Sequence, residues 1–309
     1  MPDHREPLRA RFNRLLQPQA PPACDLSPRV VATTDKGDYI RTKIVVTSHA
    51  TDAAWPNGEM PMYVLVPKDA ELPARAIVCV HQHAGQAALG KSEAAGRIGA
   101  AHANYAERYT RAGFVTVAPD MRCFEERREY WDIDQIATLR QLLHGRTMAG
   151  MFAYDVSRCV DYLVSRSDVV DAERIGVTGH SMGAMVSLVT AVVEPRIKAV
   201  VASCGVSTLA GRFARGETVP APYLIPGLAT LGDLPDVYAL IAPRPLMLFA
   251  GRKDTTFKFA DFEAAYPRLE EAWRDAGAPE KLSSVVEDVG HTTTDGMYAA
   301  GVEWFGRWL

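Results

Sequence analysis

Long hydrophobic runs, clustered cysteines and a surplus of basic residues are all missing from this 309-residue sequence. No apolar run is long enough to span a bilayer, so we expect no membrane partner. The segment from Met1 to Glu6 is charged and has no apolar core, which argues against a secretory signal peptide there. The 34 lysines and arginines are outnumbered by 37 aspartates and glutamates, so nucleic acid is not an expected partner.

The cysteines are few, odd in number and far apart. None of the five belongs to a C-x-x-C pair; they are Cys24, Cys79, Cys123, Cys159 and Cys204. This pattern favours reduced, mostly buried thiols in a cytoplasmic protein. Glycine-rich loops with the Walker or Rossmann spacing are also missing, which removes the usual sequence signal for a bound nucleotide.

The most informative feature that is present is a single G-x-S-x-G motif, Gly179–Gly183. The residues before it, Arg174–Thr178, have the apolar pattern of a buried strand, and Ala184–Ala191 after it have that of a packed helix. A serine on such a strand-to-helix turn holds its hydroxyl above the sheet, and side chains in place of the two glycines would clash with neighbouring elements. We therefore predict Ser181 as a nucleophile, with the N–H of Met182 aimed at a developing oxyanion.

A base and an acid for this serine follow it in the chain. Asp254 comes after the predicted strand 246–250, and His291 comes after the predicted strand 282–286. Because the carboxyl ends of parallel strands meet at one edge of a sheet, Ser181, Asp254 and His291 are expected to lie close together as a catalytic triad. Asp288 and Asp295 flank the histidine and are the rival acids, but neither ends a separate strand.

From residue 75 onwards the predicted strands alternate with predicted helices, which favours an α/β fold with a mostly parallel sheet covered by helices on both faces. The expected strands are 29–34, 39–48, 62–67, 76–80, 113–118, 174–178, 199–203, 246–250 and 282–286. The expected helices are 99–112, 133–143, 150–165, 182–193, 260–276 and 295–309. Residues 1–28 form an N-terminal extension with a helix at 5–17 that either packs on the main body or joins two subunits of a homo-oligomer. Residues 29–309 form a single catalytic domain.

The loop after strand 76–80 carries a second signal, Val80-His81-Gln82-His83-Ala84-Gly85. Enzymes with a serine elbow take another oxyanion N–H from this loop, and by position the donor is His83. The alternative is that His81 and His83 form a pair of metal ligands. Zinc would need a third ligand, and because no further His/Cys cluster stands nearby, we expect no metal. His180, within the elbow, is expected to pack rather than to bind.

Several segments resemble the α/β-hydrolase superfamily, in particular its dienelactone-hydrolase-like and acetyl-xylan-esterase-like branch. They are residues 78–83, 118–122, 145–147, 174–183 and 242–246, and the likeness extends over about residues 60–309. The resemblance implies an α/β-hydrolase fold with about eight strands, a Ser-His-Asp triad and carboxylic ester hydrolysis without a cofactor. Gln82 departs from the glycine of many relatives, and Ser181 replaces the cysteine of dienelactone hydrolases proper.

Two loops are candidate walls of a substrate pocket beside Gln82. Trp131, after the charge run that starts at Arg122, is a candidate to stack on a sugar, but packing is the favoured interpretation, and the charge run itself is expected to be a solvated face. The apolar, proline-rich segment 211–238 contains Tyr223 and Leu224 and suits either a pocket wall or a subunit contact.

These features together predict a cytoplasmic serine esterase that cleaves a small or medium carboxylic ester. One alternative is a serine peptidase of the prolyl-oligopeptidase type, although residues 1–60 are too few for the propeller such enzymes usually carry. The other alternative is a non-catalytic binding protein on a hydrolase fold. Such proteins commonly lose a member of the triad, whereas all three residue types are present in this sequence.

Overall fold

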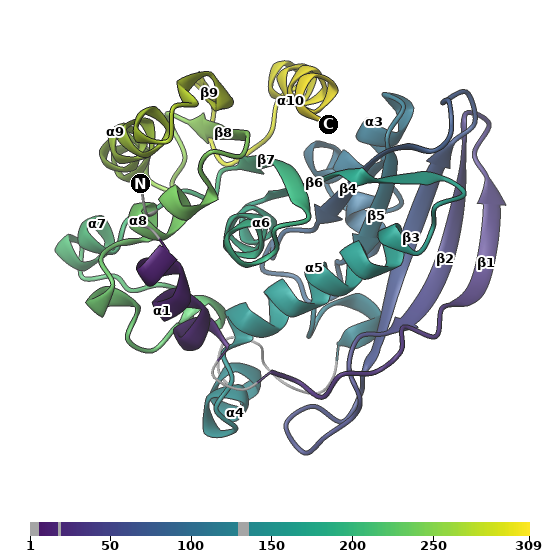
Figure 1. Ribbon diagram of the computed structural model, residues 1–309, viewed down its shortest axis with the longest axis horizontal. Helices are drawn as coiled ribbons and strands as arrows, with labels where there is room; N and C mark the ends of the chain where they lie inside the picture. The colour runs from purple at the N-terminus through teal and green to yellow at the C-terminus, as the bar shows by residue number, and fades with distance from the viewer. Residues whose placement is uncertain (1–5, 18–19, 129–135) are drawn as a thin grey trace.

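The computed structural model describes residues 6–17, 20–128 and 136–309. Trp131 lies outside these ranges. Within them the chain forms one nine-stranded sheet flanked by helices (Figure 1). The strands are β1 (Arg29–Asp35), β2 (Tyr39–Thr47), β3 (Glu59–Pro67), β4 (Ala74–Val80), β5 (Val115–Pro119), β6 (Val170–His180), β7 (Ile197–Ser203), β8 (Leu246–Gly251) and β9 (Leu282–Glu287).

The strand order across the sheet is β1-β2-β3-β5-β4-β6-β7-β8-β9. The pairs β1–β2, β2–β3 and β3–β5 are antiparallel, and every pair from β5 to β9 is parallel. The predicted antiparallel start and parallel body are therefore confirmed. The sheet has one strand more than the eight that the resemblance implies.

The helices are α1 (Glu6–Leu16), α2 (Lys91–Ala94), α3 (Tyr105–Arg111), α4 (Thr138–Leu143), α5 (Met148–Val164), α6 (Met182–Val193), α7 (Leu209–Ala214), α8 (Leu234–Tyr238), α9 (Phe259–Asp275) and α10 (Asp295–Trp308). The helix expected at 99–112 is shorter, because Gly99 has a φ of +88° and the regular turns of α3 begin only after Asn104. Sequence patterns did not reveal α2, α7 and α8, which are too short to show a helical period.

Successive side chains of β4 point to opposite faces of the sheet, and both faces are covered, which explains why its sequence is almost continuously apolar. Ala76, Val78 and Val80 point into the core beneath α5, α6, α8 and α9. Ile77 and Cys79 point into a separate core beneath α3 and α10. Successive strand side chains face opposite sides of a sheet, so a strand covered on both faces must be apolar at every position.

The N-terminal helix α1 packs on the main body. Phe12 and Leu16 are 0% and 2% exposed and belong to the core beneath α6 and α8. The Arg9 guanidinium donates hydrogen bonds to the carbonyls of Val192 and Leu240. Of the two roles expected for this extension, packing on the domain is therefore the one observed.

The charge run after Arg122 is expected to be solvated, and this expectation is wrong in part: Glu126 and Arg128 are exposed, whereas the other described charges of the run are buried or half-buried. Arg122 and Arg127 are buried and both donate to the buried carboxylate of Asp155, at 2.9 and 2.7 Å. Glu125 accepts from the buried ammonium of Lys91 at 2.7 Å. Buried charges are paired in this way because an unpaired charge inside a protein is costly.

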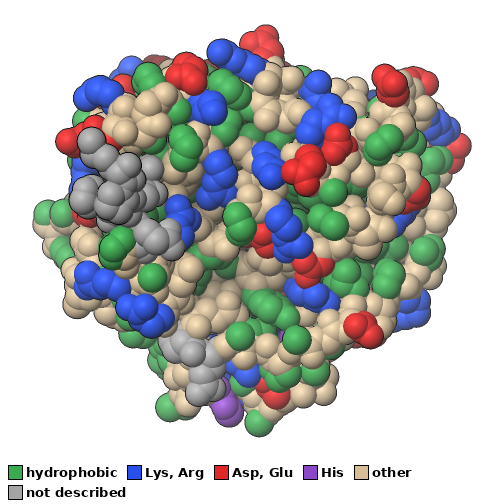
Figure 2. Space-filling model, viewed as in Figure 1, with side chains coloured by type: hydrophobic (Ala, Val, Ile, Leu, Met, Phe, Trp, Pro, Cys, Tyr) green, Lys and Arg blue, Asp and Glu red, His purple; other side chains and the backbone are tan. Residues whose placement is uncertain are grey.

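The surface and the thiols agree with the composition. On the face in Figure 2 basic and acidic side chains are interspersed. All five cysteines are free, and only Cys24 is not fully buried. Within the described residues, no helix combines the length and the hydropathy needed to cross a bilayer.

Candidate active site

Ser181 sits on a strained turn between β6 and α6. Its φ of 56° lies in the left-handed region that side chains rarely adopt. A Cβ on Gly183 would lie 2.0 Å from the carbonyl oxygen of Val80, and one on Gly179 would lie 2.4 Å from the backbone carbon of Gly183. The two glycines therefore let the start of α6 approach β4 closely, as the motif predicts, and the serine side chain turns toward a surface cavity.

Asp254 and His291 meet across neighbouring strand ends. The N–H of Arg252 donates to the Glu287 carbonyl at 2.8 Å and that of Lys253 to the Val289 carbonyl at 2.9 Å, which ties the loop after β8 to the loop after β9. His291 Nδ1 then lies 2.7 Å from Asp254 Oδ2. Because an ionised carboxylate can only accept, Nδ1 carries the proton and Nε2 is left as the basic nitrogen.

The Asp254 carboxylate is held in its charged form. Burial alone would raise its pKa, but hydrogen bonds from His291 and from the N–H groups of Phe257 and Thr256 outweigh burial and hold the pKa below its ordinary value. The rival acids are engaged elsewhere: Asp288 pairs with Lys253 at 2.7 Å, and Asp295 pairs with Arg108.

Two further rings fix the position of the His291 ring. Phe257 stacks on it, with ring centroids 5.7 Å apart and an angle of 9° between the planes. His180 lies on another side, with centroids 4.5 Å apart. Burial, together with the charges that His291 and His102 can carry, lowers the pKa of His180 far below its usual range. His180 is therefore a neutral packing residue, as expected, whereas the role of Phe257 was not foreseen.

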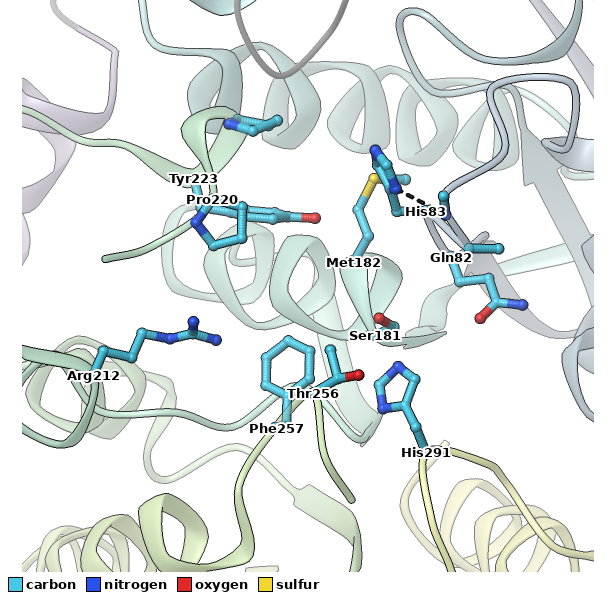
Figure 3. A pocket seen from close by; sticks show the side chains of 13 residues that line it. Gln82, His83, Ser181, Met182, Arg212, Pro220, Tyr223, Thr256, Phe257 and His291 are labelled. Carbon is cyan, nitrogen blue, oxygen red and sulfur yellow. Dashed lines mark hydrogen bonds between the residues drawn. The ribbon is translucent and has the colours of Figure 1, made fainter. Parts of the chain in front are cut away.

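The predicted oxyanion donors, Met182 and His83, line the same cavity as Ser181. Met182 is the first residue of α6, and the first N–H groups of a helix have no acceptor within it. His83 lies in the loop after β4, where its Nδ1 accepts from the N–H of Gly85 at 3.0 Å (Figure 3). The close approach of Gly183 to Val80 brings this loop and the start of α6 together.

His81 does not offer a free nitrogen to a metal. Its Nδ1 donates to the Gln82 carbonyl at 2.8 Å, and its Nε2 accepts from the N–H of Met121 at 3.1 Å. Burial lowers the pKa of His81 to about 4, so the ring is neutral. A metal pair formed by His81 and His83 is therefore not supported by the geometry.

Within the described part of the chain, two clusters have ligand-type atoms close enough to share an ion. One joins Cys204 to Asp254 and His291, but burial raises the pKa of the Cys204 thiol to about 12, which leaves it protonated. The other comprises Asp120, Glu125 and Glu126, whose carboxylates surround the Lys91 ammonium at 2.6–2.7 Å. A lysine already fills the place that a cation would take.

A cavity of about 520 Å³ opens above Ser181 (Figure 3). Of the pocket residues expected from the sequence, Gln82 and Tyr223 line it, whereas Leu224 does not and is 38% exposed. Segment 211–238, expected to be either a pocket wall or a subunit contact, also contributes Arg212, Pro220 and Pro222 to the lining, whereas Ala84, Gly85, Thr256 and Phe257 were not foreseen. Most of them lie in irregular loops, where no periodic pattern marks an inward-facing side chain.

A second cavity, of about 490 Å³, lies on the other side of His291. It shares Gln82, Ala84 and His291 with the first and is also lined by Glu93 and His102. Gln82 donates to Glu93 at 2.9 Å, so its side chain forms part of the boundary between the cavities.

The mostly parallel sheet, the helices on both of its faces and the serine on a strained strand-to-helix turn define an α/β-hydrolase fold. The sequence matches the model of the family described as "Abhydrolase family" over residues 20–284, and the chain belongs to that family.

Relatives extend this comparison. The Bacillus subtilis (strain 168) protein YtaP, provisionally named a hydrolase, is 29% identical over 252 residues, which are 81% of this chain and 83% of YtaP. A protein provisionally named as an acetyl xylan esterase from Bacteroides fragilis has a TM-score of 0.74 at 18% identity, covering 91% of this chain and 74% of that one. A glucuronoyl esterase from Solibacter usitatus has a TM-score of 0.69 at 14% identity, covering 99% and 92%. At these identities the two structures show a shared fold.

Proposed function

We propose that this protein is a serine esterase that cleaves a small or medium carboxylic ester through an acyl-enzyme. The observation that carries the proposal is the arrangement of three side chains: Ser181 on a strained turn, His291 lining the same cavity, and Asp254 bonded to the far nitrogen of His291 at 2.7 Å. Membership of the Abhydrolase family and the esterase names of the structural relatives support it.

In the acylation step, Ser181 Oγ bonds to the ester carbonyl carbon while His291 Nε2 takes the hydroxyl proton. The carbonyl oxygen becomes an oxyanion, for which the N–H groups of Met182 and His83 are the proposed donors. The bond to the alcohol oxygen then breaks, and His291 returns the proton to that oxygen. Asp254 keeps Nδ1 protonated and stabilises the imidazolium.

Deacylation repeats these steps with water. His291 takes a proton from a water molecule, whose oxygen bonds to the acyl carbon. The bond to Ser181 Oγ breaks, and the serine recovers its proton as the carboxylic acid leaves. All proton transfers take place at one nitrogen, so the reaction needs no cofactor.

Replacing the nucleophile tests this proposal. Ser181→Ala should remove nearly all turnover of 4-nitrophenyl acetate, butyrate and octanoate and of acetylated xylo-oligosaccharides. Ser187→Ala is the matched control, because that hydroxyl only donates to the Gly183 carbonyl within α6 and should leave turnover intact. Wild-type rates in Ser181→Ala on every ester that the enzyme cleaves would refute the mechanism.

The two alternative functions predict different results on a common panel of anilides, esters and phosphonates. A peptidase of the prolyl-oligopeptidase type would cleave aminoacyl anilides as readily as activated esters, whereas we expect ester cleavage to dominate. A binding protein would bind esters without turnover and would not react with a serine-directed phosphonate.

A further inference from the structure

Arg212 gives the larger cavity an isolated positive charge. Among the described residues that line this cavity, Arg212 is the only lysine or arginine, and none of those residues is an aspartate or glutamate. Figure 3 shows the guanidinium reaching from α7 toward Phe257, on the side of Ser181 away from Gln82. A permanent charge in a cavity lined by proline, tyrosine and phenylalanine is a determinant of specificity.

The guanidinium is held in place on one side only. Its Nε donates to Ser207 Oγ at 2.8 Å and its Nη1 donates to the Thr218 carbonyl at 3.3 Å. Ser207 in turn donates to Asp261 at 2.9 Å, and the Phe257 ring lies 5.7 Å from Arg212 Cζ. These contacts fix the plane of the guanidinium, while Nη2 makes no hydrogen bond to any of the described residues.

Within the described residues, no carboxylate is hydrogen-bonded to this guanidinium. Glu217 forms only a long ion pair with it, with the carboxylate oxygen 3.9 Å from Nη1, which is beyond hydrogen-bond distance. Glu217 pairs more closely with Arg215, at 3.3 Å, and both oxygens of Asp261 accept from Arg215 at 2.9 Å. Arg212 itself is only 7% exposed. In the described part of the chain, this largely buried cation with an open N–H edge therefore has no hydrogen-bonded carboxylate of the kind that usually accompanies a buried charge.

We infer that Arg212 binds a carboxylate of the substrate, so that the preferred ester carries a free carboxylate on one of its two halves. This inference rests on the proposed esterase function. A guanidinium whose orientation is already fixed binds a planar carboxylate with little loss of side-chain freedom, and the contact forms away from the reacting carbonyl. Ligand binding would supply the charge-assisted hydrogen bond that the protein leaves open at Nη2.

The test compares esters that differ only in one charge. In the acyl arm, mono(4-nitrophenyl) adipate, pimelate and suberate are compared with the same esters ending in a carboxamide. In the alcohol arm, the acetate of 4-hydroxybenzoate is compared with the acetate of 4-hydroxybenzamide. For each pair, the measured quantity is the ratio of kcat/KM for the carboxylate over the carboxamide, in the wild type and in variants.

We expect the wild type to prefer the carboxylate in one arm, and Arg212→Gln to lower that ratio on the order of 10- to 100-fold, the usual contribution of a charge-assisted hydrogen bond. Arg212→Lys should recover part of the preference, because it keeps the charge but not the planar fork. Arg215→Gln is the matched control: it removes a neighbouring charge that does not line the cavity, and should leave the ratio at its wild-type value.

Each outcome bears on a different claim. A ratio near one in both arms for the wild type contradicts the inference, and so does a ratio that Arg212→Gln leaves unchanged. A loss of thermal stability with equal losses on charged and neutral esters shows that Arg212 only braces α7. If neutral esters are cleaved in a Ser181-dependent way without any preference for carboxylates, the proposed function stands and only the role of Arg212 is wrong. If no ester is cleaved, the proposed function fails first.

Discussion

The contacts of each aspartate near His291 indicate which one is the acid of the proposed triad. Asp254 accepts from His291 and from the N–H groups of Thr256 and Phe257, which leaves its carboxylate charged and pointed at the histidine. Asp288 is the first residue after the end of β9. It pairs with Lys253 in solvent, where both side chains are about two-thirds exposed. An aspartate therefore holds a histidine ring in one loop, whereas an aspartate in the next loop forms only a solvent-exposed ion pair.

Replacing each aspartate by asparagine separates these roles. Asp254→Asn should lower kcat on aryl esters by roughly 10³- to 10⁴-fold, because an amide at this position favours the wrong imidazole tautomer. Asp288→Asn should change kcat less than about twofold, since an exposed ion pair contributes little. Steady-state kinetics on one ester checks both, and a costly Asp288→Asn beside a silent Asp254→Asn would reverse the choice of acid.

The sequence was sufficient to predict that Ser181, Asp254 and His291 lie at one edge of the sheet, but it predicted only part of the cavity lining, for a physical reason. Ser181, Asp254 and His291 each follow a strand whose apolar run is visible in the sequence, so topology alone brings them to one edge. Phe257, in the segment after β8, contacts His291 and lies beside Arg212 of the short helix α7. No periodic sequence pattern predicts contacts between such segments.

At the scale of elements, the close contact between β4 and the start of α6 holds the site together. Gly183 approaches the carbonyl of Val80, which is the residue just before the loop carrying His83. One helix terminus thus positions Ser181, the N–H of Met182 and the loop that carries His83. The tight packing is possible because the contact is between backbones without an intervening side chain.

Gly183→Ala tests this contact. Its Cβ would lie 2.0 Å from a backbone oxygen, so α6 or β4 must shift. We expect a loss of about 1–3 kcal/mol of unfolding free energy in urea titrations, from overpacking. The kcat/KM on aryl esters should fall roughly 10²-fold, because a displacement of about 1 Å in a reacting group has that effect.

Gly306→Ala in α10 is the control for this substitution. Its Cβ would meet only the Arg75 guanidinium at 3.7 Å, an ordinary contact. Alanine should leave kcat/KM unchanged and add about 0.5–1 kcal/mol of stability, as is usual for a helical glycine. Equal losses in both variants would show that the Val80 contact is not special.

For the whole molecule, the parallel part of the fold was predictable because most of its strands are buried and rich in apolar residues. Strands such as β4 and β7 are buried on both faces and read as continuous apolar runs, and the segments between them show a helical period. The fate of the charge run after Arg122 was not predictable, because burial of Arg127 and Glu125 depends on Asp155 and Lys91, which lie far away in the chain. Long-range ion pairs leave no local pattern.

Labelling with a fluorophosphonate is the most direct test of the proposal that Ser181 forms a covalent acyl-enzyme. We expect one adduct per chain, on the peptide that holds Ser181, with ester turnover lost in proportion to labelling and with no adduct in Ser181→Ala. Labelling at another residue, or full turnover in a fully labelled enzyme, would contradict the assignment of Ser181 as the nucleophile.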